Sequence, residues 1–193
     1  MIAMIAGAAR ELKIGDPRDV SVHVGPVIDA EARQKLCAYV ETMQRDARVL
    51  YSGPDLPGNL LAPQMFEIES AAMLRQEIFG PILHVVRYRE GELDKLLTLI
   101  DDNGYGLTLG IHSRIEETIE GIVARLPVGN VYINRNMIGA VVGVQPFGGR
   151  ALSGTGPKAG GPHYLPRFAT EQTLANNTSA AGGNAALFAL DEG

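Results

Sequence analysis

The sequence has one cysteine, Cys37, and no tryptophan among its 193 residues. A single cysteine excludes a disulfide framework and any cysteine-rich zinc site. A basic cluster is missing as well, since the formal net charge is −5 and no run of Lys and Arg could make the phosphate contacts that nucleic acids require. We therefore expect no DNA or RNA partner for this segment.

Long apolar runs are also absent. No stretch approaches the length that spans a bilayer, and the apolar residues at 1–9 lack the basic flank and the long apolar core of a signal peptide. Together with the lone cysteine, this predicts a cytoplasmic location. The apolar fraction of 46% and the charged fraction of 20% are typical of a globular chain with one sizeable core.

Helix-like and strand-like patterns alternate along the chain. Helices are expected at residues 2–12, from an Asp29 cap to Ala47, at 93–100, and from a Ser113 cap over 114–126. Extended segments are expected at 20–28, 48–51, 60–68, 82–88, 107–111 and 128–133, with 82–88 fully buried. Helical crossovers between strands predict an α/β fold with a mainly parallel open sheet and helices on both faces.

Cys37 lies inside the helix expected after Asp29, and no His stands within a helical turn to activate it. This favours a buried, inert thiol over a catalytic nucleophile. His23, His84 and His112 lie in or beside expected strands without metal-ligand spacing, so structural or surface roles are favoured and no metal site is expected.

Residues 145–165, QPFGGRALSGTGPKAGGPHYL, are so rich in glycine and proline that they predict a loop. The Gly160-Gly161 pair lets the backbone approach a ligand, and successive N–H groups can form a nest for an anion. The loop contains cationic side chains but no Asp or Glu. An ordinary surface loop is the alternative, and Phe147 within it favours a ligand site.

Glu77 stands just before the strand expected at 82–88, next to Phe79 and the Gly80-Pro81 turn. In open α/β sheets, ligands bind where loops meet strand ends. Glu77 is therefore a candidate binding residue, and the alternative is a solvated loop carboxylate.

Four motifs, in this order and spacing, resemble the second half of the aldehyde dehydrogenase superfamily. They are EIFGP at 77–81, Asn103 with Gly106-Leu107, GNV at 129–131 with Asn134, and PFGG at 146–149 followed by Ser153-Gly154. One such motif is weak evidence, whereas four in order are specific. The finer stretch at 154–171 and the tail are similar to the glutamate-semialdehyde dehydrogenases that end bifunctional proline-utilisation proteins.

The resemblance implies NAD as cofactor and an aldehyde that bears a carboxylate as substrate. Glu77 would bind the hydroxyls of the nicotinamide ribose, and Phe79 would pack beside that ribose. Phe147 would lie along the nicotinamide and aldehyde channel. Gly160 and Gly161 would present backbone N–H groups to the α-carboxylate of the substrate.

The resemblance also implies a domain organisation. Residues 1–166 would be the C-terminal half of a catalytic domain, 167–174 a strand that adds to a neighbouring subunit's sheet in a homo-oligomer, and 175–193 a tail. The nucleophilic cysteine, the general-base glutamate and the dinucleotide-binding domain would precede Met1, so we expect an inactive fragment. An upstream proline dehydrogenase domain with FAD is a further option.

Two alternatives from other classes stay open. The first is a non-catalytic interaction module that docks onto a partner through the strand expected at 167–174. The second is an anion-binding domain unrelated to aldehydes, built on the glycine nest.

Overall fold

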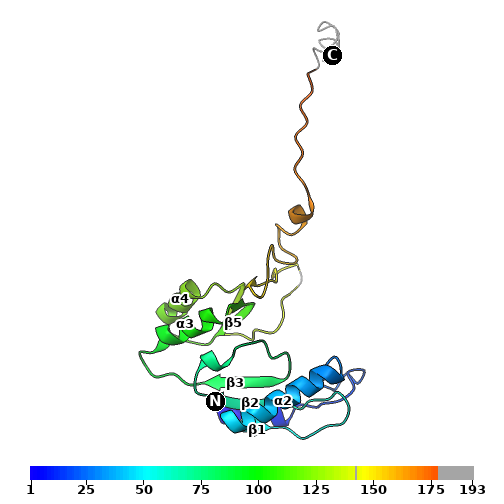
Figure 1. Cartoon of the computed structure of the whole chain (residues 1–193). Helices are drawn as coiled ribbons and strands as arrows, with labels where there is room; N and C mark the ends of the chain where they lie inside the picture. Colours follow the sequence, from blue (N-terminus) through cyan, green and yellow to red (C-terminus); the bar gives the residue numbers. More distant parts are fainter. Residues whose placement is uncertain (142, 178–193) are drawn as a thin grey trace. The chain divides into compact units, whose positions relative to one another are not determined.

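The computed structural model describes residues 1–141 and 143–177. The chain divides into two compact units, the first made of Met1–Ile138 with Gly148–Thr155, and the second of Gly139–Phe147 with Gly156–Gly193. Figure 1 shows helices alternating with strands in the first unit, which confirms the α/β class. The division at 166 and 174 stays a prediction, and residues 178–193 of the expected tail lie outside the described residues.

The first two helices are α1, Ile2–Arg10, and α2, Ala30–Asp46. No side chain caps α1 at its N-terminus, and this helix ends two residues earlier than expected. The Asp29 carboxylate accepts a hydrogen bond from Ala32 N at 2.7 Å. This bond satisfies one of the N–H groups that a helix start leaves unpaired, so the expected cap of α2 is confirmed.

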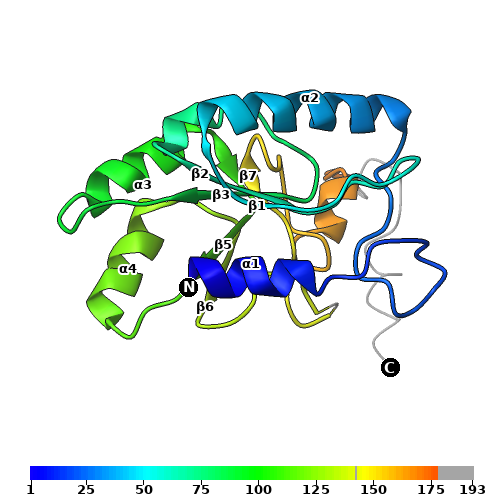
Figure 2. The same ribbon diagram turned by 90° about the horizontal axis from the view of Figure 1, so that it is seen from below.

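A three-stranded sheet of β1 (Arg48–Ser52), β2 (Gln64–Ile68) and β3 (Ile82–Val86) packs against these helices. β1 pairs with β2 antiparallel, and β2 pairs with β3 parallel. Met43 of α2 packs on Phe66 and Ile68 of β2 in the main core cluster. Figure 2 shows α1 and α2 on opposite sides of this sheet, so helices on both faces are confirmed here.

The other strands form two small sheets. β5 (Thr108–Ile111) and β6 (Asn130–Ile133) pair in parallel, while β4 (Tyr105–Gly106) and β7 (Arg150–Ala151) pair antiparallel. α3, Leu93–Asp102, precedes β4, and α4, Glu116–Arg125, connects β5 to β6. Parallel pairing is thus found at β2–β3 and β5–β6, but the described strands do not join into one continuous sheet.

Two expectations about extended segments are wrong. Residues 20–28 form turns with one parallel bridge between Ile14 and Val24, because this β-branched run has no strand to pair with among the described residues. Val20 is fully exposed as a result. β3 is not fully buried, since it is the edge strand of its sheet and Leu83 is 43% exposed.

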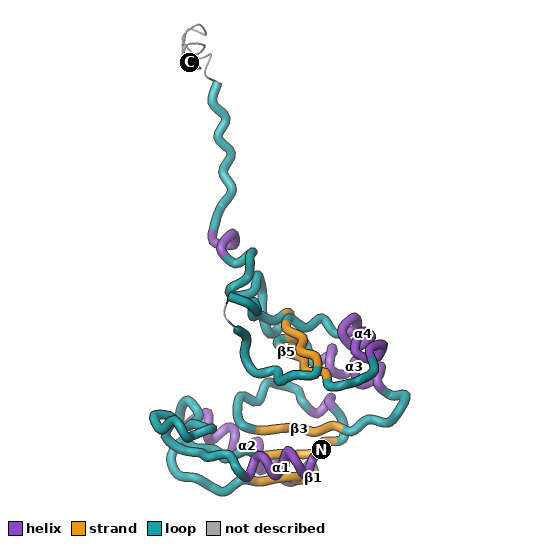
Figure 3. The backbone as a smooth tube through the Cα atoms, turned by 180° about the vertical axis from the view of Figure 1, so that it is seen from behind, coloured by secondary structure: helices purple, strands orange, loops and turns teal. Residues whose placement is uncertain are grey.

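Two expected element boundaries also differ. α4 begins after Ile115, because the Ser113 hydroxyl accepts a hydrogen bond from Ile115 N at 3.1 Å in a local turn and does not cap the helix. The segment 167–174 starts in a 3₁₀ turn, Leu165–Phe168, and continues without strand pairing (Figure 3). This segment has no backbone partner within the described chain, and its expected pairing with the sheet of a neighbouring subunit stays a prediction.

Candidate functional site

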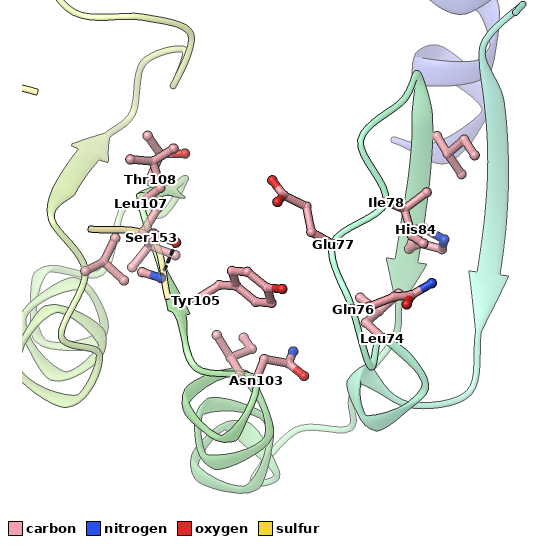
Figure 4. A pocket seen from close by; sticks show the side chains of 15 residues that line it. Leu74, Gln76, Glu77, Ile78, His84, Asn103, Tyr105, Leu107, Thr108 and Ser153 are labelled. Carbon is pink, nitrogen blue, oxygen red and sulfur yellow. Dashed lines mark hydrogen bonds between the residues drawn. The ribbon is translucent and has the colours of Figure 1, made fainter. Parts of the chain in front are cut away.

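A cleft of about 370 Å³ in the first unit lies beside Glu77, and we call it the Glu77 cleft. Figure 4 shows the Glu77 side chain extending from the loop before β3 into this cleft, opposite Tyr105 and Thr108. Within the described chain, no side chain or backbone group forms a hydrogen bond or ion pair with the Glu77 carboxylate. Glu77 can therefore accept hydrogen bonds from two hydroxyl groups of a ligand.

His84 also lines the Glu77 cleft, and its ring joins β3 to α2. The Tyr39 hydroxyl lies 2.8 Å from His84 Nε2, and Phe66 stacks on the imidazole with 6.5 Å between ring centroids. Burial lowers the pKa of His84 and raises the pKa of Tyr39. The pair is therefore neutral near pH 7, and its geometry is that of a structural link.

A second hollow, the Phe79 groove, has a volume of about 650 Å³ and is lined by residues 25–28, 78–81 and Ala32. Phe79 is 86% exposed. Its neighbour Gly80 is pressed against α2, because a Cβ at this position would come within 2.8 Å of Leu36 Cδ1. An exposed ring two residues from the unpaired Glu77 carboxylate suits a ligand that has a sugar ring with two hydroxyl groups.

Residues 148–154 of the glycine-rich loop lie in the first unit, and we call them the Gly148 turn. The Asn130 side chain is 8% exposed, and its Oδ1 accepts a hydrogen bond from Gly148 N at 3.1 Å. The Ser153 hydroxyl accepts a hydrogen bond from Gly106 N at 3.1 Å. A Cβ on Gly129 would lie 2.0 Å from Gly148 O, so the turn is packed directly against the start of β6.

In the second unit, Phe147 and Ala159 exchange two backbone hydrogen bonds of 3.0 and 2.9 Å. Gly160 follows with a φ of 72°, in the left-handed region that favours glycine. Gly161 N donates to Lys158 O at 2.9 Å, so this donor is engaged in a turn. Among the described residues nothing accepts a hydrogen bond from Gly160 N. The anchoring role of the pair stays a prediction, and this geometry favours Gly160.

Cys37 lies on α2, where it is half-buried, although a buried thiol was expected. Its side chain lines neither the Glu77 cleft nor the Phe79 groove. Among the described residues, no three potential metal-ligating side chains gather, and no helix has the length and apolar character needed to cross a membrane.

The chain can be compared with known proteins. Residues 1–174 match the sequence model of the aldehyde dehydrogenase family. The chain belongs to the aldehyde dehydrogenase family. Bifunctional protein PutA of Escherichia coli is 46% identical over 189 residues, which are 93% of this chain and 14% of the relative. A 1-pyrroline-5-carboxylate dehydrogenase of a Geobacillus species is 39% identical over 160 residues, 81% of this chain and 31% of the relative.

Solved structures of aldehyde dehydrogenase relatives agree with this fold. A mutant of proline utilization A from Bradyrhizobium japonicum is 64% identical with a TM-score of 0.88, and the match covers 94% of this chain and 19% of that one. A 1-pyrroline-5-carboxylate dehydrogenase from Thermus with bound NAD is 36% identical with a TM-score of 0.77, covering 86% and 33%. The resemblance to glutamate-semialdehyde dehydrogenases is thereby confirmed. The chain spans 14% of the length of the E. coli PutA relative.

The motifs quoted from the sequence include Asn130 and Ser153, but their functions were not predicted. Their partners lie 18 and 47 residues away along the chain, at Gly148 and Gly106. The only hint in the sequence was that both residues lie inside family-like motifs. Their hydrogen-bond partners could be identified only from the folded chain.

Proposed function

We propose that this chain is the C-terminal part of an NAD-dependent dehydrogenase that oxidises L-glutamate γ-semialdehyde to glutamate. The semialdehyde is in equilibrium with the cyclic pyrroline carboxylate. Family membership and the two kinds of relatives support this assignment. Within the structure, the observation that supports it best is the unpaired Glu77 carboxylate in its cleft, two residues along the chain from the exposed Phe79 ring.

The described residues fit the nicotinamide half of the cofactor. NAD supplies the hydride acceptor when it is bound. The Glu77 carboxylate would accept hydrogen bonds from the two ribose hydroxyls, and the exposed Phe79 ring would pack beside the ribose. Both residues are on the loop that enters β3, so one short segment orients this part of the cofactor.

The glycine-rich loop is the proposed substrate anchor. Phe147 lines the aldehyde channel, and its two hydrogen bonds to Ala159 fix the backbone directly before Gly160. The Gly160 N–H then donates to the α-carboxylate of the semialdehyde, with Gly161 joining when its turn opens. A charge-assisted hydrogen bond of this kind contributes about 1.5–3 kcal/mol, which is about ten- to a hundred-fold in binding.

We infer that the chain alone is inactive. Aldehyde oxidation in this family passes through a cysteine thioester, and Cys37 lies on α2 away from both hollows. The purified chain is therefore expected to give no NADH with glutamate semialdehyde.

A grafted enzyme tests the substrate assignment. It joins this chain to the preceding part of the Bradyrhizobium japonicum relative, and kcat/KM is measured for glutamate semialdehyde and for an aliphatic aldehyde without a carboxylate. We expect Gly160→Val to lower kcat/KM at least about ten-fold for the semialdehyde and little for the other aldehyde. A folded grafted enzyme that does not reduce NAD with glutamate semialdehyde would contradict the proposed function.

Gly58→Val is the matched control. Gly58 has a φ of 64° and Gly160 a φ of 72°, and a Cβ at either position would meet no atom within 4 Å. The two substitutions thus impose the same kind of backbone strain, but Gly58 is outside the glycine-rich loop. Equal effects of the two variants, or equal losses on both aldehydes, would show that Gly160 only shapes the backbone.

The proposed homo-oligomer and the alternative of an interaction module are both supported by exposed apolar side chains in the second unit. Leu165, Phe168 and Leu174 are 78%, 74% and 87% exposed, which provides apolar side chains for a partner subunit. Light scattering of the chain with and without residues 167–177 tests this, because loss of self-association on deletion is expected. The cytoplasmic location and the FAD domain stay predictions.

A further inference from the structure

We propose that Asn130 is a positioning residue of this dehydrogenase, whose buried side chain fixes the Gly148 turn and thereby the backbone that leads into Phe147. This inference rests on the proposed function, because it assigns Asn130 to the aldehyde site. Asn130 does not contact the substrate in this account. It acts through the backbone of Gly148.

The first observation is the contact itself. Asn130 is one of two polar residues in the buried set of the described chain, and its Oδ1 accepts a hydrogen bond from Gly148 N at 3.1 Å. The β6 strand, which starts at Asn130, pairs in parallel with β5 and is therefore a rigid base. The backbone of Gly148 is thus held from a strand and not from another loop.

The second observation is the close packing around this bond. A Cβ on Gly129 would lie 2.0 Å from Gly148 O, and a Cβ on Gly149 would lie 2.5 Å from Ser153 O. Glycine at both positions lets the turn approach the strand closely enough for the Asn130 amide to reach Gly148. The close packing therefore allows the Asn130 hydrogen bond at the residue that follows Phe147.

The consequence for the site follows from the covalent chain. Phe147 is bonded to Gly148 on one side and hydrogen-bonded to Ala159 in its own unit, directly before Gly160. When Gly148 N loses its acceptor, the peptide bond that leads into Phe147 loses its anchor on β6. A part-buried N–H left without an acceptor also makes this conformation of the turn less favourable.

Three variants test the inference. Asn130→Leu keeps the size and removes the acceptor, Asn130→Ser leaves an acceptor too short to reach Gly148, and Asn130→Asp keeps Oδ1. The matched control is Gln64→Leu, since Gln64 is also buried and its side chain donates to Ala62 O at 3.2 Å, away from the glycine-rich loop. Amide exchange at residues 147–149 is measured in this chain, and kcat/KM in the grafted enzyme.

We expect the Leu and Ser variants to speed exchange at Gly148 about ten-fold and to lower kcat/KM for glutamate semialdehyde by a similar factor. In Asn130→Asp, the exchange rate at Gly148 and kcat/KM are expected to stay within about three-fold of the unmutated values. Gln64→Leu is expected to change neither the exchange rate at Gly148 nor kcat/KM. Unchanged exchange in the Leu and Ser variants, or faster exchange with full activity, would overturn the inference. An inactive but folded unmutated grafted enzyme would instead refute the proposed function, and the exchange data would still decide whether Asn130 holds the turn.

Discussion

Gly129→Ala is expected to be among the most damaging single-methyl changes in the first unit. The added Cβ would lie 2.0 Å from Gly148 O and 2.8 Å from Gly149 Cα, so the Gly148 turn must retreat by about 1 Å. Overpacking of this kind costs about 1–3 kcal/mol. The displaced turn also loses the Asn130 hydrogen bond, at about 1 kcal/mol. We therefore expect the free energy of unfolding to fall by about 2–4 kcal/mol.

The same substitution elsewhere gives the control. Gly121 lies within α4, and a Cβ there would meet no atom within 4 Å. Gly121→Ala is expected to raise the free energy of unfolding by about 0.5–1 kcal/mol, because alanine is the better helix former. Urea unfolding followed by circular dichroism compares the two variants. Equal free energies of unfolding for Gly121→Ala and Gly129→Ala would show that the Gly148 turn does not pack tightly against Gly129 and would refute the reasoning.

The remaining predictions concern His84, Cys37 and Asp29. The pKa of His84 is lowered in the folded chain, so its neutral form stabilises the fold. This contribution to the free energy of unfolding is fully present above the unfolded pKa of about 6.5 and is lost as the pH falls through the folded pKa. In His84→Gln, the urea midpoint should therefore fall less over this acidic range. Cys37→Ala should leave NAD reduction by the grafted enzyme unchanged, and a complete loss in that assay would assign catalysis to Cys37. Asp29→Ala should lower the free energy of unfolding by about 1 kcal/mol, since Ala32 N loses its acceptor; an unchanged urea midpoint would contradict the cap.

Features set by near neighbours in the chain were predictable from the sequence. The Asp29 cap and α2 behind it depend on residues within one turn of each other. Runs of β-branched and apolar residues located β2, β3, β5 and β6. The ordered motifs also indicated the family, which the comparisons confirmed.

The tertiary structure decided everything that needs a distant partner. The run at 20–28 has the composition of a strand, but within the described part of the chain it finds no strand to pair with and forms a single bridge, from Val24 to Ile14. The Ser113 hydroxyl bonds within its own turn, and this local competition cannot be distinguished from a cap by composition. Asn130 reaches Gly148 across 18 residues of sequence, and Ser153 reaches Gly106 across 47. Composition cannot reveal such hydrogen bonds, because the folded chain must first bring distant segments together, as the pairing of β4 with β7 brings Ser153 beside Gly106.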